Sequence, residues 1–195
     1  MKNKNGLVVV ISGPSGVGKG SVSSLLRKEL PDIEECITCT TRKPREGEKD
    51  GKDYFFLTRE EFEARRKNGF FLESALVHGN LYGTPRDEVE SLIKKGKLVL
   101  LEIDVQGGIN VKRSGVNALG VFLMPPEPAL EYLEKRLEKR GTETPGEIRT
   151  RTKNALGEIA RKNEYDAVVT NDDLRRCTEE VKEIIMSRLR ELNGE

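Results

Sequence analysis

The sequence predicts an α/β fold in which helices cover both faces of a parallel sheet. Two observations carry this prediction. Four short apolar runs alternate along the chain with longer segments whose apolar residues recur at helical spacing, and this alternation is typical of a parallel sheet with crossover helices. The first of those runs leads through a glycine-rich turn directly into a helical pattern, which is the arrangement expected of a loop that binds phosphate.

The predicted strands are apolar along most of their length, as expected of strands that are buried on both faces of a sheet. They cover Leu7–Ser12, 97–103, Ala118–Met124 and Ala167–Thr170. The predicted helices cover 19–30, 87–95, 128–140, 147–162 and 174–192. Pro31 ends the first helix, and Pro125 follows the third strand, since proline fits neither element's interior.

Two segments stand outside this alternation. Residues 40–82 are rich in charge, glycine and aromatic side chains, and we expect a small insertion with strands at 54–57 and 70–77 and a helix at Arg59–Lys67. Residues 136–151 form a basic stretch that Gly141, Pro145 and Gly146 interrupt. Because these residues break helices, the stretch is predicted to be a mobile flap rather than a packed element.

Composition narrows the class of protein. The 34 Lys and Arg residues balance 33 Asp and Glu residues, so neither nucleic acid nor a membrane surface is an expected partner. No stretch approaches the roughly 18 apolar residues of a membrane-spanning helix. The polar start runs into a predicted strand and does not resemble a signal peptide, and three cysteines without such a signal favour a cytoplasmic location.

Cys36 and Cys39 form a Cys-x-x-Cys pair, which is compatible with half of a zinc or redox site. No second pair accompanies it and His78 is the single histidine, so a structural role is favoured. In that interpretation both cysteines lie on one strand, where residues three apart point to opposite faces. The reactivity of Cys36, Cys39 and Cys177 does not follow from the sequence.

Residues 13–19 read Gly-Pro-Ser-Gly-Val-Gly-Lys and match the phosphate-loop pattern Gly-x-x-x-x-Gly-Lys between a strand and a helix. The glycines let backbone N–H groups converge on a phosphate, the helix start adds partial positive charge, and Lys19 reaches the β and γ oxygens. The motif departs from its usual form because Gly20 stands where Ser or Thr would bind Mg²⁺, and Ser21 follows one residue later. The predicted fold is therefore a three-layer P-loop fold.

The strand at 97–103 ends in carboxylates, Glu102 within it and Asp104 directly after it. In a phosphate-loop fold this is where Mg²⁺ or its waters are held. Elsewhere, Arg42 and Arg45 lie three residues apart, and Tyr54 follows. Arginine forks suit a dianionic phosphate, although a solvated basic loop is the plainer alternative for these residues taken alone.

Over nearly the whole chain these motifs resemble those of the guanylate kinase family. Besides the phosphate loop, the matching stretches are 41–48 (Thr-Arg-x-Pro-Arg-x-Gly-Glu), 51–54 (Gly-x-Asp-Tyr), 79–83 (Gly-Asn-x-Tyr-Gly), 103–107 (Ile-Asp-x-Gln-Gly), 140–144 (Arg-Gly-Thr-Glu-Thr) and 171–172 (Asn-Asp). The resemblance implies a core of 1–37, 85–125 and 163–195, a GMP-binding subdomain at 38–84 and a mobile lid region at 126–162. Leu81, Thr84 and Thr38 depart from the better-known members, but none of them removes a charge.

The resemblance implies transfer of the γ-phosphoryl group of ATP to GMP or dGMP, giving ADP and GDP, with Mg²⁺ as cofactor, in a monomer or small homo-oligomer. The implied catalytic residues are Lys19, Arg42, Arg136, Arg140 and Arg151. The implied ATP-binding residues are Gly13, Pro14, Ser15, Gly16, Val17, Gly18, Lys19, Gly20, Ser21 and Asn171. The implied GMP-binding residues are Thr38, Arg42, Arg45, Tyr54, Glu73, Tyr82, Thr84 and Asp104. Mg²⁺ is expected on ATP phosphates and waters, with Glu102, Asp104 and Ser21 as further candidates.

Elementary chemistry agrees with this assignment. Guanine presents two adjacent donors, which suit the carboxylates of Glu73 and Asp104, whereas adenine presents an acceptor there. The acceptor phosphate has a second pKa near 6 and is already an oxyanion at neutral pH, so no general base is required. Catalysis then depends on positioning and charge neutralisation.

Two alternatives remain at this point. The first is a non-catalytic binding module like the guanylate-kinase-like domains of membrane scaffold proteins, which the complete phosphate loop with Lys19 disfavours. The second is a kinase of the same fold that acts on a sugar phosphate, which the Glu73 and Asp104 pair disfavours.

Overall fold

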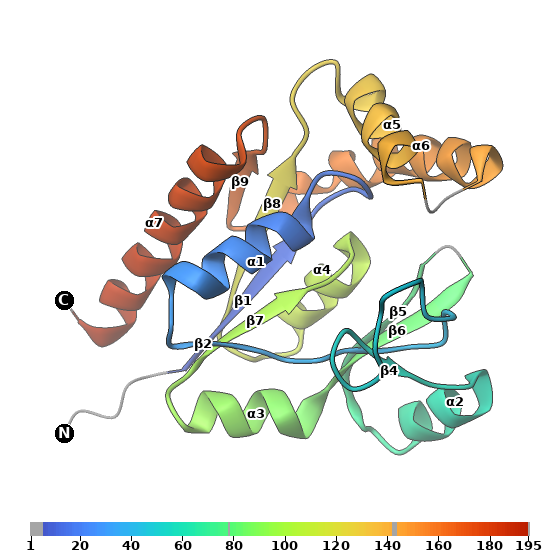
Figure 1. The fold of residues 1–195 in the computed structure, drawn as a ribbon. Coiled ribbons are helices and arrows are strands. Elements are labelled where there is room, and N and C mark those ends of the chain that lie inside the picture. Colours follow the sequence, from blue (N-terminus) through green and yellow to red (C-terminus); the bar gives the residue numbers. More distant parts are fainter. Residues whose placement is uncertain (1–5, 78, 142–143, 195) are drawn as a thin grey trace.

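The computed structural model describes residues 6–77, 79–141 and 144–194. Its main sheet contains five parallel strands in the order β2-β7-β1-β8-β9. The strands are β1 (Leu7–Ser12), β2 (Ile33–Glu35), β7 (Leu98–Glu102), β8 (Ala118–Met124) and β9 (Ala167–Thr170). The predicted α/β class with a parallel sheet is confirmed (Figure 1). β2, a strand of three residues of which two are exposed, was not predicted.

Helices cover both faces of the main sheet (Figure 1). One face packs against α1 (Lys19–Glu29) and α7 (Leu174–Asn193), and the other against α3 (Arg86–Lys94) and α4 (Val105–Arg113). Successive residues of β1 alternate between these two cores: Val9 packs with the first pair of helices and Val10 with the second. The prediction that β1 is buried on both faces is therefore confirmed.

A second, four-stranded sheet has the order β4-β3-β6-β5. Its strands are β3 (Cys39–Thr40), β4 (Phe55–Phe56), β5 (Phe71–Val77) and β6 (Asn80–Pro85), and α2 (Arg59–Lys67) packs on it. α2 begins at a capping box in which Thr58 and Glu61 satisfy each other's backbone N–H groups. The expected helix and the two expected strands are present, whereas β3 and β6 were not predicted.

The helices predicted at 128–140 and 147–162 are confirmed, whereas the prediction that 136–151 is not a packed element is wrong. The described residues of this stretch belong to two regular helices, α5 (Ala129–Arg140) and α6 (Pro145–Ala160), which pack against each other. Gly141 adopts a left-handed conformation that ends α5, and Pro145 is the first residue of α6 behind the capping residue Thr144. The supposed breakers therefore stand at helix ends, and Gly146 is the second residue of α6. Residues 142–143 lie outside the described residues, and the mobility of the segment stays a prediction.

The prediction that Cys36 and Cys39 share one strand is also wrong. β2 ends at Glu35 and β3 begins at Cys39, because the chain passes here from the main sheet to the second sheet. Each thiol is buried in a different core, and burial raises the pKa of Cys39 to about 11 and that of Cys36 further. Such thiols stay protonated at neutral pH and are poor nucleophiles.

Candidate active site

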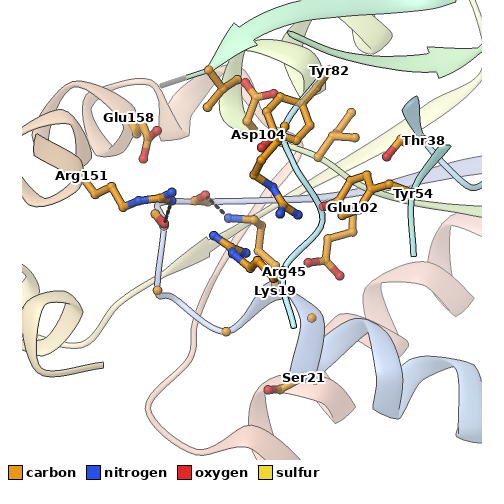
Figure 2. A pocket seen from close by; sticks show the side chains of 18 of the residues that line it. Lys19, Ser21, Thr38, Arg45, Tyr54, Tyr82, Glu102, Asp104, Arg151 and Glu158 are labelled. Carbon is orange, nitrogen blue, oxygen red and sulfur yellow. Dashed lines mark hydrogen bonds between the residues drawn. The ribbon is translucent and has the colours of Figure 1, made fainter. Parts of the chain in front are cut away.

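A cavity of about 510 Å³ lies at the carboxyl edge of the main sheet, where β1 and β7 end (Figure 2). This is the edge at which parallel α/β sheets bind ligands. Its walls come from the phosphate loop, the second sheet, the end of β7 and helices α5 and α6. The predicted site residues that line it are Gly13, Ser15, Gly16, Gly18, Lys19, Gly20, Ser21, Thr38, Arg42, Arg45, Tyr54, Glu73, Tyr82, Glu102, Asp104, Arg136 and Arg151.

Four predicted site residues do not line this cavity, namely Pro14, Val17, Thr84 and Asn171. Val17 is fully buried under the loop. The side chain of Arg140, the last residue of α5, lies outside the described residues. His78, which the sequence singled out only as the single histidine, lies outside them as well.

The phosphate loop depends on glycine at two points of close approach. Gly13 has a φ of 146° and Gly18 a φ of 102°, which other residues rarely adopt. A Cβ atom at Gly13 would lie 2.4 Å from the carbonyl oxygen of Leu123. Gly18 also caps α1 without a side-chain hydrogen bond, so no capping side chain competes with a ligand for the N–H groups at the start of the helix. Lys19 Nζ donates to the carbonyl oxygen of Gly13 at 2.7 Å.

Asn171 supports the phosphate loop through a hydrogen bond. Its buried Nδ2 donates to the carbonyl oxygen of Val17 at 2.8 Å. The hydroxyl of Tyr132 donates to the carbonyl oxygen of Asn171 at 3.1 Å and accepts from Arg136 Nη1 at 2.8 Å. This chain of bonds connects the loop to α5, and the expected position of Asn171 beside an adenine ring stays a prediction.

Arg42, Arg45, Tyr54 and Tyr82 gather on the wall formed by the second sheet and its connecting loop. Glu48 orients both arginines: its Oε1 accepts from Arg42 Nη2 at 2.8 Å, and its Oε2 accepts from the backbone N–H of Arg45 at 2.7 Å. The guanidinium of Arg42 lies 5.4 Å from the ring centre of Tyr54. Burial raises the pKa of Tyr54 to about 12, so its hydroxyl remains a donor. Sequence reasoning gave Glu48 no role, although it lies in the quoted motif.

Two carboxylates approach each other where β5 of the second sheet, which carries Glu73, meets the start of α4 at Asp104. Glu73 is 7% exposed; its Oε1 accepts from Thr84 Oγ1 at 2.8 Å, and its Oε2 has no hydrogen-bond partner among the described residues. Asp104 caps α4, a helix that was not predicted, and its Oδ1 accepts from the N–H groups of Gln106 and Gly107 at 2.8 and 3.1 Å.

Gly107 allows this close approach. A Cβ atom there would lie 2.9 Å from Glu73 Oε2 and 3.2 Å from Asp104 Oδ2. Burial raises the pKa of Glu73 to about 7; the Thr84 hydrogen bond opposes this increase, and the charge of Asp104 adds to it. The second oxygens of both carboxylates therefore lie beside Gly107, and both residues line the cavity.

Glu102 lies next to Gly20, at the end of the phosphate loop. A Cβ atom at Gly20 would lie 3.4 Å from Glu102 Oε1, so Glu102 borders the position from which a serine or threonine would reach Mg²⁺. Ser21 lies on α1 and lines the same cavity (Figure 2). In the part of the chain that the structure describes, no cluster of three His, Cys, Asp or Glu residues could hold a metal ion by itself.

Helix α6 contributes a basic and an acidic side chain to the cavity (Figure 2). Arg151 Nη1 donates to Ser15 Oγ at 2.8 Å. Glu158 was not predicted; burial raises the pKa of its carboxyl, an increase that the charge of Lys19 opposes. One sequence signal could have found it, because residues seven apart on a helix lie on the same face and Arg151 was already a candidate.

Comparisons with known proteins agree on one family. The family model described as guanylate kinase matches residues 5–188. A guanylate kinase of Fusobacterium nucleatum is 47% identical over 92% of this chain and 96% of its own length. One from Clostridium perfringens is 43% identical over 95% of this chain and 85% of its own length. The crystal structure of a guanylate kinase from Anaplasma phagocytophilum superposes with a TM-score of 0.77 at 33% identity, covering 97% of this chain and 94% of that one.

Proposed function

The chain belongs to the guanylate kinase family, and on that premise we infer that it catalyses the ATP-dependent phosphorylation of GMP to GDP. One observation carries this inference beyond the family: a single cavity joins a phosphate loop to an arginine–tyrosine cluster and to a pair of buried carboxylates. The first suits the phosphates of ATP, the second a dianionic acceptor phosphate, and the third the two adjacent donors of guanine.

In this reaction an oxygen of the GMP phosphate attacks the γ-phosphorus of ATP. The bond from the γ-phosphorus to the bridging oxygen breaks, and its electrons stay on the β-phosphate of the departing ADP. Because the attacking phosphate is already an oxyanion, the protein needs to supply position and positive charge rather than a base. We assign Lys19 to the β and γ oxygens, and Arg42 and Arg45 to the acceptor phosphate.

The guanine pocket is assigned to Glu73 and Asp104, with Thr38 and Thr84 as neighbouring hydroxyls. The unpartnered Oε2 of Glu73 supports this assignment, because a buried acceptor without a donor calls for a ligand that provides one. Adenine would present an acceptor to the same oxygen. A mismatch of this kind in a buried polar pocket costs up to about 10⁴-fold in discrimination.

Arg136, Arg140 and Arg151 are proposed to neutralise the phosphates from the side of α5 and α6. Asn171 is proposed to act next to the adenine while it braces the loop. The proposed ATP site is completed by the backbone of 13–19 together with Gly20 and Ser21. Acceptance of dGMP, a monomer or small homo-oligomer as the working state, and a cytoplasmic location stay predictions.

Mg²⁺ is the proposed cofactor. The described residues fit an ion that is held mainly by ATP phosphates and waters, because a few separate carboxylates such as Glu102 and Asp104 face the cavity but form no cage. This is the usual way in which Mg²⁺ binds in phosphoryl-transfer sites. Bound there, the ion would supply positive charge that offsets the charge developing on the phosphates during transfer.

One assay tests the acceptor. ADP release is measured with GMP, dGMP, AMP, UMP and a ribose bisphosphate as acceptors. We expect activity with GMP and dGMP and almost none with the others. The non-catalytic alternative predicts no ADP with any acceptor, and the sugar-phosphate alternative predicts ADP with the bisphosphate.

Substitutions test the clamp in the same assay. Arg42→Ala and Arg45→Ala should raise KM for GMP far more than KM for ATP, since each removes a charge-assisted bond of roughly 1.5–3 kcal/mol from the acceptor phosphate. Arg66→Ala is the control, because Arg66 lies on α2 of the same subdomain and pairs with Glu63 away from the cavity. Equal effects on both substrates would contradict the assignment.

A further inference from the structure

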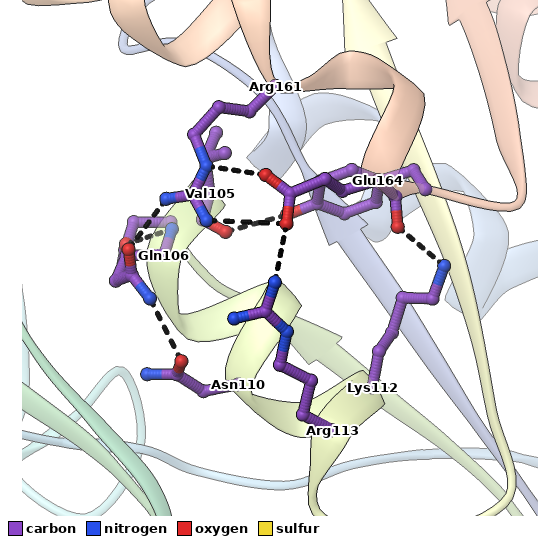
Figure 3. A network of polar contacts seen from close by, with 9 residues as sticks. Val105, Gln106, Asn110, Lys112, Arg113, Arg161 and Glu164 are labelled. Atoms are coloured by element: carbon purple, nitrogen blue, oxygen red, sulfur yellow. Dashed lines mark hydrogen bonds and ion pairs between the residues drawn. The ribbon is translucent and has the colours of Figure 1, made fainter.

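A network of polar side chains joins the end of α6 to the first turn of α4, outside the cavity (Figure 3). Gln106 lies at its centre. Its Oε1 accepts from Arg161 Nη1 at 2.6 Å, and its Nε2 donates to Asn110 Oδ1 at 2.9 Å. The proposed reaction gives none of these three residues a part, which raises the question of what the network does.

On one side the network supports both guanine-facing carboxylates. The backbone N–H of Gln106 donates to Asp104 Oδ1, so the first turn of α4 sets where Asp104 stands. Asn110 Nδ2 donates to the carbonyl oxygen of Ser74 at 3.5 Å, one residue from Glu73. Gln106 therefore contacts the supports of both carboxylates, that of Asp104 through its backbone N–H and that of Glu73 through its side chain and Asn110.

On the other side the network holds the end of α6. Arg161 directly follows this helix, ten residues after the cavity-lining Arg151. Its guanidinium is divided between two partners, Gln106 through Nη1 and Glu164 through Nε at 2.8 Å. Glu164 is itself held by Arg113 at 3.0 Å, and the Arg161 hydrogen bond is the main reason why its pKa is lowered. Arg161 thus acts as a fork: Glu164 orients its guanidinium, and Gln106 accepts the direct side-chain bond from the end of α6 to α4.

We propose that Gln106 and Arg161 form a positioning pair that couples helix α6 to the base-facing carboxylate Asp104. This inference rests on the proposed function. A guanine held by Asp104 fixes the first turn of α4, and through the pair it favours the placement of α6 in which Arg151 faces the phosphates. Coupling of this kind is reciprocal. If GMP tightens the binding of a nucleotide on the phosphate loop by some factor, that nucleotide must tighten the binding of GMP by the same factor.

The test measures that factor. The dissociation constant of GMP is determined by calorimetry on the full chain with and without a saturating non-hydrolysable ATP analogue, and the ratio of the two constants is the coupling. We expect Gln106→Ala and Arg161→Ala each to bring the ratio at least about fivefold closer to one, since site-to-site couplings are typically 5- to 150-fold. The double variant should lose no more than either single variant, because both remove the same link.

Arg113→Ala is the matched control. It removes a neighbouring ion pair to the same Glu164 but leaves the contact between Arg161 and Gln106, so the ratio should stay at the wild-type value. If Arg161→Ala does not fold, Arg161→Lys carries the same expectation, because a single ammonium cannot reproduce the fork.

A purely structural role would lower thermal stability and weaken both nucleotides equally while the ratio stays unchanged, and that result would overturn the proposal. A wild-type ratio of one would overturn it as well. Failure of the wild-type protein to bind GMP at all would instead overturn the proposed function.

Discussion

Gly20 leaves the phosphate loop without the hydroxyl that usually binds Mg²⁺, and Glu102 borders the vacated position. Lys19 is therefore the main protein charge that the loop itself can place on the β and γ oxygens. We expect Lys19→Met to abolish phosphoryl transfer without unfolding the protein, whereas Ser21→Ala should cost much less activity. Gly20→Ser should be tolerated, because a Cβ atom there meets nothing closer than 3.4 Å. Steady-state kinetics and circular dichroism of the three variants check this.

A second outcome would reverse the roles of these residues. If Ser21→Ala is as inactive as Lys19→Met and regains activity at high Mg²⁺, then Ser21 binds the metal. Near-normal activity of a folded Lys19→Met variant would exclude the proposed role of Lys19.

Glu73 links pH to both binding and stability. Its pKa of about 7 in the unliganded protein means that the carboxylate that accepts from guanine forms only as pH rises through 7. We expect KM for GMP to fall between pH 6.5 and 8 in the wild-type protein. Glu73→Gln should have a higher KM for GMP, and the part of the pH dependence that comes from the Glu73 carboxyl should be missing. Subtracting the two pH curves removes the titration of the GMP phosphate, which both proteins share.

The stability effect has a definite sign. A carboxyl whose pKa is raised on folding contributes stability below its ordinary pKa of 4.5 and loses that contribution as pH rises through 7. Glu73→Gln should therefore be more stable than the wild type at pH 8, by up to about 3 kcal/mol, with the difference closing near pH 4.5. Urea unfolding at both pH values measures it, and Glu90→Gln on the exposed face of α3 is the control. A variant less stable than the wild type at pH 8 would contradict the assigned pKa.

Residue type decided which site residues could be predicted. Arg42 and Arg45 stand beside hydroxyls and aromatics in a loop, where charges without a core role point to a ligand, and the structure brings them to one cavity wall. Glu158 lies in a helix rich in charged residues, and its spacing of seven residues from Arg151 is the one signal that distinguishes it. Its function in the cavity depends on which face of α6 is turned inward, and only tertiary packing determines that.

At the scale of elements, strands buried on both faces were predictable because their apolar runs are continuous. β6 was not predictable, since Asn80, Tyr82 and Gly83 interrupt any apolar run. The strand belongs to a small sheet with a core of its own. α4 was missed because Gly107 and Gly108 lower helix propensity. Both glycines are required by close contacts: a Cβ at Gly108 would lie 2.3 Å from the hydroxyl of Tyr165. In α4, packing contacts and the site require glycine even though glycine has a low helix propensity.

Two glycines in helices test whether close contacts, rather than helix propensity, require glycine at a given position. Gly107→Ala should raise KM for GMP about 10- to 100-fold, because the new Cβ would lie 2.9 Å from Glu73 Oε2 and displace a carboxylate that reads the base. Gly157→Ala in α6 is the matched control, since a Cβ there meets nothing within 4 Å. It should raise stability by about 0.5–1 kcal/mol with unchanged kinetics. Kinetics and thermal unfolding of both variants are the measurements; an unchanged KM for GMP in Gly107→Ala would contradict the placement of the two carboxylates.

At the scale of the whole molecule, the cavity is built from parts that are far apart in the sequence. The cations Arg42 and Arg45 come from the segment before α2, Lys19 from the phosphate loop, and Arg136 and Arg151 from α5 and α6. Carboxylates such as Glu48 and Glu158 offset part of this positive charge, and bound phosphates would offset more of it. Within the described residues, no helix is long and apolar enough to cross a membrane.

Binding of both nucleotides should therefore draw the second sheet and the α5–α6 pair inward over the main sheet. The phosphates would neutralise the converging arginines, and closure would keep water from competing with GMP for the γ-phosphoryl group. We expect the radius of gyration measured by solution scattering to fall with an analogue that joins adenosine and guanosine through phosphates. The decrease should exceed that with GMP or an ATP analogue alone. Arg151→Ala should reduce the compaction, while Arg149→Ala, an exposed arginine of the same helix outside the cavity, should leave it unchanged. An unchanged radius of gyration in the wild-type protein with the analogue bound would mean that the site is rigid, and ATP hydrolysis without GMP should then approach the rate of phosphoryl transfer.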